Sequence, residues 1–420
     1  MVLKKGIQDR FKYFFNVKVT KNSFTMIFIS IVGYFVWLYA FPMFGPITDN
    51  LLVGLKALAI EKGRFVQLFL ISMIVSSFIS GYLIDKVEKR IVFIWVPTIM
   101  ASLLTFAFVW LNKISEVFLF SFLLGIAAGV SPAAWGAFFA DHTSPEDRGR
   151  TMGISIGFSM PIAYLFLITE PFEIGVTAKA ELLIIGSLYL VTLLTFFLRP
   201  QEKTQVITSS KGRRGAGFRQ LFFYSIPIFL FYWVMGVLLS IVFPTVQDQV
   251  RTEIFYLIWT FPFLFGAISA GVLFDTMGRN FPTIVGLAIT GVSLAVLGIF
   301  GIRLGYVCIT TLAIGCSFVT VFSFIVWADL APANARGTYY GAGTGLMASA
   351  ILLGLMSAGT LFGSISASQI KSYILLSSVA LFLCIPPLII TEDVLPKELI
   401  EKRRFQQYLD QARKKYVKKG

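Results

Sequence analysis

The sequence predicts an all-α integral membrane protein with 12 transmembrane helices in two pseudo-symmetric six-helix bundles. Three observations lead to this fold class: an apolar composition, a long series of apolar stretches, and two motifs that recur in the second half of the chain. Of the 420 residues, 56% are hydrophobic and only 14% are charged, and the mean hydropathy is +0.79. A water-soluble fold needs more charged surface than this composition provides, so lipid is the expected solvent.

Apolar stretches follow one another along the whole chain. A helix needs about 20 mostly apolar residues to cross the hydrocarbon core of a bilayer, and each stretch is near that length. In the first half they cover residues 24–44, 64–84, 91–111, 115–140, 151–169 and 181–198. In the second half they cover residues 221–245, 252–274, 281–301, 303–328, 337–361 and 372–391. Few residues are left over for a soluble domain.

Basic residues are distributed unequally between the two sides of this helix map. Most of the 36 lysines and arginines fall on the side that holds both termini, and such an excess marks the cytoplasmic side of a membrane. We therefore expect a multi-pass protein of the cell (plasma) membrane with both termini in the cytoplasm. The net charge of +14 lies beside membrane segments, so the expected partner is a bilayer with anionic headgroups and not nucleic acid.

The helix map divides the chain into five parts. They are a basic amphipathic cytoplasmic N-terminus (1–23), an N-terminal six-helix bundle (24–198), a cytoplasmic linker (199–220), a C-terminal six-helix bundle (221–391) and a basic cytoplasmic tail (392–420). The linker is rich in Arg, Lys, Gly, Ser and Thr, as expected between bundles. Both terminal segments have the pattern of helices that lie in the membrane interface.

Catalytic and cofactor signals do not emerge from the sequence. Cys308, Cys316 and Cys384 all lie in predicted spans and lack C-x-x-C spacing, so we expect no disulfide framework, no metal site and no cofactor. A membrane enzyme would need clustered His, Asp or Cys at membrane depth, and an ATP-driven pump would need a GxxxxGK[ST] loop. Neither is present, so we do not expect an enzyme.

Two motifs recur at nearly the same offset in the second half. The first is Gly81-Tyr82-Leu83-Ile84-Asp85, which returns 190 residues later as Gly271-Val272-Leu273-Phe274-Asp275. The second is Ala140-Asp141 with Arg148-Gly149, which returns 188 residues later as Ala328-Asp329 with Arg336-Gly337. Each copy follows the corresponding helix of its half. The two halves therefore share an origin.

These motifs resemble those of the major facilitator superfamily, whose loop between helices two and three carries a Gly-x-Leu-x-Asp-Arg-x-Gly-Arg pattern. The resemblance covers about residues 20–392, although Lys86 and Glu88 replace the preferred Arg and Gly in the first copy. It implies the major facilitator fold, a monomer, and transport of a small-molecule substrate. It also implies alternating access, in which two bundles rock about a site near the bilayer midplane.

The resemblance further implies a cytoplasmic latch between the halves. Asp85 would meet helix eleven near Gly337, and Asp275 would meet helix five near Gly149, because a helix N-terminus stabilises a carboxylate. Arg90 or Lys89 would pair with Asp141, and Arg279 with Asp329. The predicted latch residues are Gly81, Asp85, Lys89, Arg90, Asp141, Arg148, Gly271, Asp275, Arg279, Asp329 and Arg336.

Aromatic and hydroxyl side chains dominate the polar chemistry of the predicted spans. All 22 acidic residues and the single His142 map to loops or helix ends, so no proton carrier is expected at the midplane, where charge is expensive. The predicted cavity residues are Tyr34, Trp37, Gln67, Ser131, Trp135, Tyr232, Trp233, Tyr256, Ser317 and Thr320. Such a set suits a small, neutral, amphipathic or aromatic solute.

The predicted function is therefore secondary active or facilitative transport of such a solute. A proton-coupled drug or metabolite exporter is the close alternative. Against it, Ser121 precedes Gly125 where those exporters place an Arg. The alternative of another class is a non-transporting sensor or scaffold on the same fold. Latch residues in both halves favour the transporter, because a scaffold does not need to alternate.

Overall fold

The structure is a computed structural model whose described part is entirely helical apart from turns and connections. It describes residues 19–42, 46–56, 59–87, 89–167, 178–198, 218–244, 252–301, 305–357 and 367–395. Most of the predicted amphipathic N-terminus, the linker from 199 to 217 and the basic tail from 396 lie outside the described residues.

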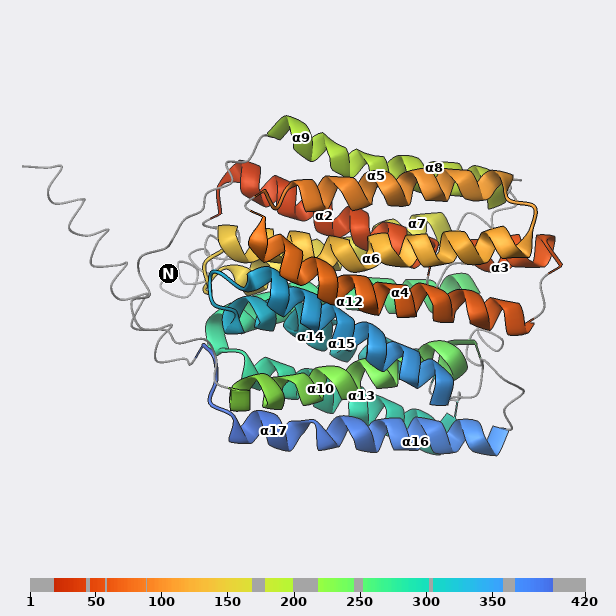
Figure 1. Cartoon of the computed structure of the whole chain (residues 1–420). Coiled ribbons are helices and arrows are strands. Elements are labelled where there is room, and N and C mark those ends of the chain that lie inside the picture. The colour runs from red at the N-terminus through yellow and green to blue at the C-terminus, as the bar shows by residue number, and fades with distance from the viewer. Residues whose placement is uncertain are drawn as a thin grey trace, which may run out of the picture.

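Each half contributes six membrane-length helical segments, whose axes are roughly aligned with one another in Figure 1. The first half comprises α2 (Lys21–Ala40), α3 (Pro46–Gly54), α4 (Ala59–Lys86), α5 (Val92–Ala107) with η1 (Phe108–Trp110), α6 (Ile114–His142), α7 (Arg148–Leu167), and α8 (Ala178–Val191) with η2 (Thr192–Leu194) and α9 (Thr195–Leu198). The second half comprises α10 (Phe218–Val237) with the π-helical η4 (Leu238–Val242), α12 (Thr252–Met277), α13 (Asn280–Phe300), α14 (Gly305–Leu330), α15 (Arg336–Ser357), and α16 (Ala367–Leu383) with α17 (Ile385–Ile390). The helix α3 has only 9 residues and is not counted among the six membrane-length segments of the first half.

These segments confirm the predicted order of 12 transmembrane helices. In the described part of the chain, 11 of them are long and apolar enough to cross a membrane. The twelfth, α7, has 20 residues and occupies the predicted stretch 151–169. Its first turn contains Arg148 and Arg150, which make it less apolar. The helices α4 and α16 begin earlier than predicted, because polar residues extend their first turns.

The two halves pack side by side as two bundles of helices (Figure 1). The helices α5, α8 and α9 lie at the outer side of the first half, and α13, α16 and α17 at that of the second. The start of α2 and the end of α17 lie at the same end of the molecule, on the left of Figure 1. We call this the terminal end, and the other the opposite end.

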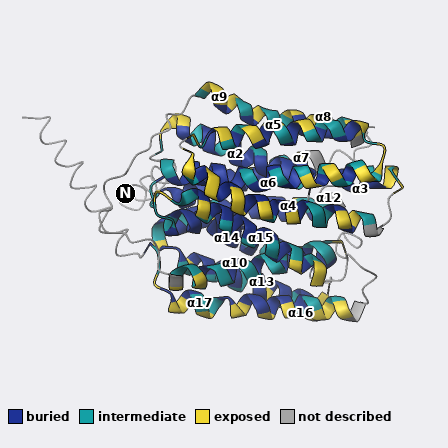
Figure 2. Ribbon diagram, in the orientation of Figure 1, coloured by how far each residue is buried: buried dark blue, intermediate teal, exposed yellow. Residues whose placement is uncertain are grey.

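The outer surface of the bundles is apolar. Large hydrophobic side chains project from the outer helices, including Leu103 (59% exposed) and Phe197 (78% exposed), and exposed positions are coloured yellow in Figure 2. Helices satisfy their own backbone hydrogen bonds, so such a surface is stable in hydrocarbon. The chain is therefore a multi-pass membrane protein.

Two equivalent seams join the halves near the terminal end. In the α4–α15 seam, a Cβ added to Gly81 would lie 2.6 Å from the carbonyl oxygen of Gly337. In the α7–α12 seam, a Cβ added to Gly271 would lie 2.4 Å from the carbonyl oxygen of Gly149. The absence of side chains thus lets the backbones touch, as small residues do where membrane helices pack closely.

Candidate functional site

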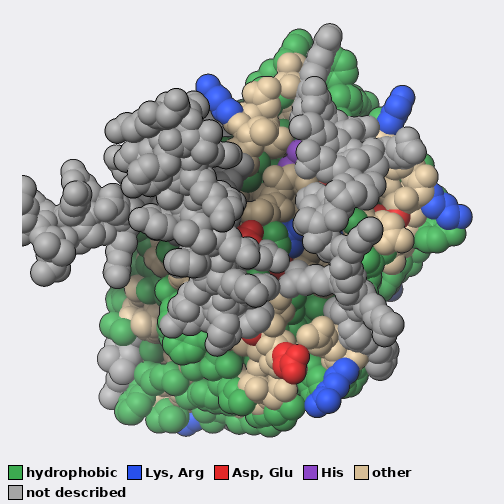
Figure 3. Space-filling model, turned by 90° about the vertical axis from the view of Figure 1, so that its left-hand side faces the viewer, with side chains coloured by type: hydrophobic (Ala, Val, Ile, Leu, Met, Phe, Trp, Pro, Cys, Tyr) green, Lys and Arg blue, Asp and Glu red, His purple; other side chains and the backbone are tan. Residues whose placement is uncertain are grey.

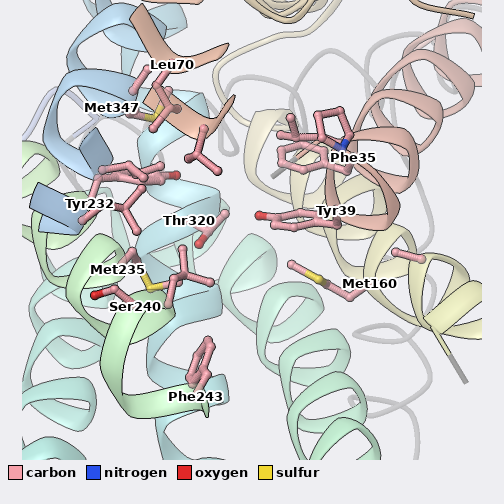
Figure 4. A pocket seen from close by; sticks show the side chains of 18 of the residues that line it. Phe35, Tyr39, Leu70, Met160, Tyr232, Met235, Ser240, Phe243, Thr320 and Met347 are labelled. Carbon is pink, nitrogen blue, oxygen red and sulfur yellow. The ribbon is translucent and has the colours of Figure 1, made fainter. Parts of the chain in front are cut away.

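A cavity of about 560 Å³ lies between the two halves. Its wall is formed by α2, α3, α4, α6 and α7 of the first half and by α10, η4, α12, α14 and α15 of the second (Figure 4). The volume is in the range of sites that bind small molecules, roughly 300–1,000 Å³. A molecule in the cavity would therefore contact both halves at once.

The cavity wall is mostly apolar and aromatic, and its polar groups are mainly hydroxyls. Tyr34, Tyr39, Tyr232 and Thr320 are among the hydroxyl-bearing residues. Lys62 is the only charged side chain among the lining residues that the structure describes. It lies in the first turns of α4, at the opposite end. Such a wall suits a solute with a large apolar surface and few polar groups, since an unpaired polar group loses its bonds to water on entry.

An aromatic layer lies between the cavity and the terminal end. It consists of Phe35, Trp135, Phe324 and Tyr340, which we call the aromatic floor. The ring centroids of Phe35 and Phe324 are 5.5 Å apart, and those of Trp135 and Tyr340 are 6.5 Å apart. Because each pair joins the two halves, the floor holds the halves together at this level.

The structure places only some of the predicted cavity residues on the cavity wall. Tyr34, Tyr232, Tyr256 and Thr320 line the cavity, and Trp135 lies in the aromatic floor. The residues outside the lining are Trp37, Gln67, Ser131, Trp233 and Ser317. These five predicted residues do not form part of this cavity wall.

Trp37 and Ser131 pack inside the first half. The Trp37 indole donates to Thr105 Oγ1 at 3.0 Å and stacks on Tyr189, with ring centroids 5.0 Å apart. Ser131 Oγ lies 3.2 Å from the Tyr189 hydroxyl. Ser317 is also fully buried, with its hydroxyl on the carbonyl oxygen of its own helix. These polar groups are paired within one half and do not reach the cavity.

The cavity face of α2 differs from the predicted one. Its lining residues are Tyr34, Phe35, Leu38 and Tyr39, and Pro42 of the turn after α2 also lines the cavity. The prediction followed the aromatic stripe that includes Trp37 and therefore missed Phe35 and Tyr39. Two aromatic faces on one helix cannot be ranked from the sequence, because burial against a neighbour and lining of a cavity both favour aromatic residues.

Replacing Trp37 with Phe is expected to lower the free energy of unfolding by about 1 kcal/mol, the typical net value of one buried hydrogen bond. Thermal unfolding in detergent measures the change. Trp110→Phe is the matched control, because Trp110 is 67% exposed on the outer surface and is expected to tolerate the change. Equal melting temperatures for Trp37→Phe and the unsubstituted chain would contradict the packing role.

The first charge cluster lies at the terminal end of the α4–α15 seam and comprises Asp85, Arg90, Asp141 and Arg336. The carboxylate of Asp85 accepts hydrogen bonds from two backbone N–H groups in the first turn of α15, at 2.7 and 2.6 Å. Asp141 is paired with Arg90 through one oxygen and with Arg336 through the other. Lys89 is exposed next to this cluster. The cluster ties α4 and α6 to α15.

The second charge cluster lies at the α7–α12 seam and comprises Arg148, Arg150, Asp275, Arg279 and Asp329. Asp275 accepts from two backbone N–H groups in the first turn of α7, at 2.8 and 2.9 Å. It also lies 3.1 Å from Arg150 Nε and 3.3 Å from Arg279 Nη1. Asp329 is 2.6 Å from Arg279 Nε and 2.5 Å from Arg148 Nη1. This cluster repeats the first one with added partners.

Burial distinguishes the two clusters. The charged side chains of the second cluster are at most 5% exposed, whereas Asp141 of the first is 20% exposed. Figure 3 looks onto the terminal end of the molecule and shows acidic and basic side chains near the centre of that face. Charge pairs shielded from water interact more strongly, and breaking one leaves an uncompensated buried charge. The second cluster is therefore the stronger connection.

Arg279 is the central cation of the second cluster and is fully buried. Burial alone would lower its pKa, but the carboxylates of Asp329 and Asp275 more than offset this and raise the pKa of Arg279 above its ordinary value. Its Nη2 also donates to the carbonyl oxygen of Pro145 in the first half, at 2.6 Å. The guanidinium therefore stays charged and bridges the halves.

Two residues that bind to members of the second charge cluster were not predicted from the sequence. Arg150 binds Asp275 as described, and also Asp147, the residue just before α7. Asp393, which follows α17, accepts from the backbone N–H groups of Arg279 and Asn280 at 2.8 and 3.0 Å. No repeated motif marks either residue, so the sequence carried no signal for them.

Comparisons with known proteins agree with this architecture. The family model described as Major Facilitator Superfamily matches residues 23–355. A solved structure, described as a bacterial homologue of the iron transporter ferroportin in an outward-facing state, is 19% identical with a TM-score of 0.67. A second, of the same description with soaked iron, is 18% identical with a TM-score of 0.66. Each match covers 88% of this chain and 98% of the other. The search of curated proteins found no match.

Proposed function

This chain belongs to the major facilitator superfamily, and we propose that it moves a small, uncharged, amphipathic or aromatic solute across the membrane by alternating access. Membrane transport in general, and not enzymatic catalysis, follows from the family. The observation that carries the finer proposal is the cavity between the halves, with its apolar, aromatic and hydroxyl wall. Movement of the halves about this cavity would change the side from which it is reached.

The cavity is closed at one end of the molecule and extends toward the other, which supports a single conformational state. The aromatic floor and both charge clusters close the terminal end, whereas the lining extends to Thr48 and Lys62 near the opposite end. If both termini are cytoplasmic, as the basic residues predict, this is an outward-facing state. The charge clusters then serve as the cytoplasmic latch. The two similar solved structures are also described as outward-facing.

The wall chemistry supports an uncharged solute. Among the lining residues that the structure describes, there is no Asp, Glu, His or Cys. Transition metals are held by such side chains, and a buried cation needs an opposite charge or strong acceptors. Iron, which is named for the similar solved structures, is therefore not part of this proposal. Transport is secondary active or facilitative.

Ligand-induced thermal stabilisation tests the proposal, because a solute that binds the folded state raises its melting temperature. The purified chain is screened against sugars, amino acids, organic acids and uncharged aromatic amphiphiles, and each compound that binds is tested for flux into proteoliposomes. We expect uncharged amphiphiles to bind and to move. If a solute of another class alone binds, or if none is transported, the proposed function is wrong.

Trp259→Ala is expected to weaken the binding of these solutes at least tenfold, since buried aromatic side chains dominate binding in such pockets. Trp259 lines the cavity, and its ring centroid lies 4.8 Å from that of Phe243. Titration of the stabilising solute into both proteins measures the ratio of Kd values. Trp110→Ala is the control, because Trp110 lies on the outer surface. Unchanged binding in Trp259→Ala would place the site elsewhere.

A further inference from the structure

Three hydroxyl groups from both halves meet within the cavity. Figure 4 shows Tyr39 of α2 facing Thr320 of α14, with the oxygen of Tyr232 of α10 directed toward the same space. Electrostatic neighbours of the Tyr232 hydroxyl include Tyr39, Ser323 and Thr320. We call Tyr39, Tyr232 and Thr320 the hydroxyl triad. Its members lie on helices of both halves, so a group bound here would touch the two parts that move.

The threonine and serine hydroxyls in and near the triad donate their protons to carbonyl oxygens of their own helix. Thr320 Oγ1 donates to the carbonyl oxygen of Cys316 at 2.8 Å, and Ser323 Oγ donates to that of Val319 at 2.7 Å. Each hydroxyl has one proton and two acceptor lone pairs. With its proton on the Cys316 carbonyl oxygen, the Thr320 hydroxyl offers a ligand acceptor lone pairs.

The surroundings restrict what kind of donor can bind. The labelled neighbours of the triad in Figure 4 include Met160 and Met235, which are flexible and apolar and adapt to ligands of different shape. The described lining contains no Asp or Glu that could balance a buried cation. A donor on an uncharged molecule is thus favoured over an ammonium group.

We propose that the hydroxyl triad is a polar subsite that accepts a hydrogen bond from the substrate, and that the substrate is an uncharged amphiphile bearing a hydroxyl or amide N–H donor. This rests on the proposed function and narrows its substrate class. The apolar body of the substrate lies against the aromatic and methionine wall. Tyr39, which sequence reasoning missed, becomes a residue that determines specificity.

Three probes of nearly equal shape separate a donor from an acceptor and from an apolar group. They are 2-naphthol, which donates, 2-methoxynaphthalene, which only accepts, and 2-methylnaphthalene, which does neither. Their Kd values are measured by isothermal titration on the full chain in detergent. In the unsubstituted protein we expect 2-naphthol to bind about tenfold more tightly than either of the others, the fold-change of one added hydrogen bond.

Variants of the triad test whether it supplies this preference. In Thr320→Val and Tyr39→Phe, the advantage of 2-naphthol is expected to fall severalfold, while the Kd of 2-methylnaphthalene stays unchanged. Thr320→Ser keeps a hydroxyl and is expected to retain the advantage, which controls for loss of folding. Tyr306→Phe is the matched control, because Tyr306 is 49% exposed on the outer surface and is not among the residues that line the cavity.

The outcomes distinguish this inference from the proposed function. Equal binding of 2-naphthol and 2-methoxynaphthalene overturns the donor preference, and an advantage that survives both triad variants overturns the subsite. In either case the cavity still binds amphiphiles, and the proposed function stands. If none of the three probes binds and no uncharged amphiphile is transported, both proposals are wrong.

Discussion

Asp275→Ala is expected to lower the free energy of unfolding by about 3–5 kcal/mol, the usual cost of removing one partner from a buried ion pair. The Asp275 carboxylate is fully buried and binds Arg150, Arg279 and two backbone N–H groups of α7. Its removal leaves Arg279 with Asp329 as its remaining carboxylate contact in the second charge cluster. Thermal unfolding of the purified variant measures the loss.

Asp85→Ala is the matched comparison, because the internal repeat provides it. Asp85 makes the same two backbone contacts on α15, but its side chain is 9% exposed and its nearest contact with Arg90 is 3.8 Å. We expect a clearly smaller loss of stability than for Asp275→Ala. Equal losses in the two variants would show that burial does not rank the clusters, and the assignment of the second cluster as the stronger connection would be wrong.

Gly271→Val is expected to prevent closure at the terminal end. A Cβ on Gly271 would lie 2.4 Å from the carbonyl oxygen and 2.9 Å from the carbonyl carbon of Gly149, and backbone atoms cannot yield as a flexible side chain can. The clash exists only while the two halves touch at this seam, so the variant should favour the state in which they are apart.

Spin labels at Val87 and Met277 measure this opening. These exposed positions follow Asp85 and Asp275 at the same spacing, and they lie in different halves at the terminal end. Double electron–electron resonance is expected to give a longer distance in Gly271→Val. Gly54→Val is the control, because nothing lies within 4 Å of a Cβ at Gly54. An unchanged distance in Gly271→Val would contradict the seam as the point of closure.

The fold was predictable because lipid imposes a strong pattern on the sequence. Helices that cross the bilayer must be long and apolar, and the duplicated motifs ending in Asp85 and Asp275 identified the two halves. The resemblance of these motifs to the major facilitator superfamily also implied that the two carboxylates would face Gly337 and Gly149, and the structure brings them together. Residues that lie in a duplicated motif can therefore be identified from the sequence alone.

The cavity was harder to predict, because its residues carry no repeat. Trp37 and Tyr39 are both aromatic and lie on the same helix, yet one packs against Tyr189 and the other faces the cavity. The difference depends on how α2 is rotated against its neighbours, which tertiary packing decides. Asp393 is a similar case, because its role depends on where the chain passes after α17.

Alternating access is the central claim, and distances at both ends of the molecule test it most directly. One label pair is Val87 and Met277 at the terminal end, and the other is Val53 and Val307, which are exposed at the opposite end. Between the unsubstituted chain and Gly271→Val, we expect the first distance to lengthen and the second to shorten. If the first lengthens while the second stays the same or also lengthens, the halves do not rock about the cavity, and the account is wrong.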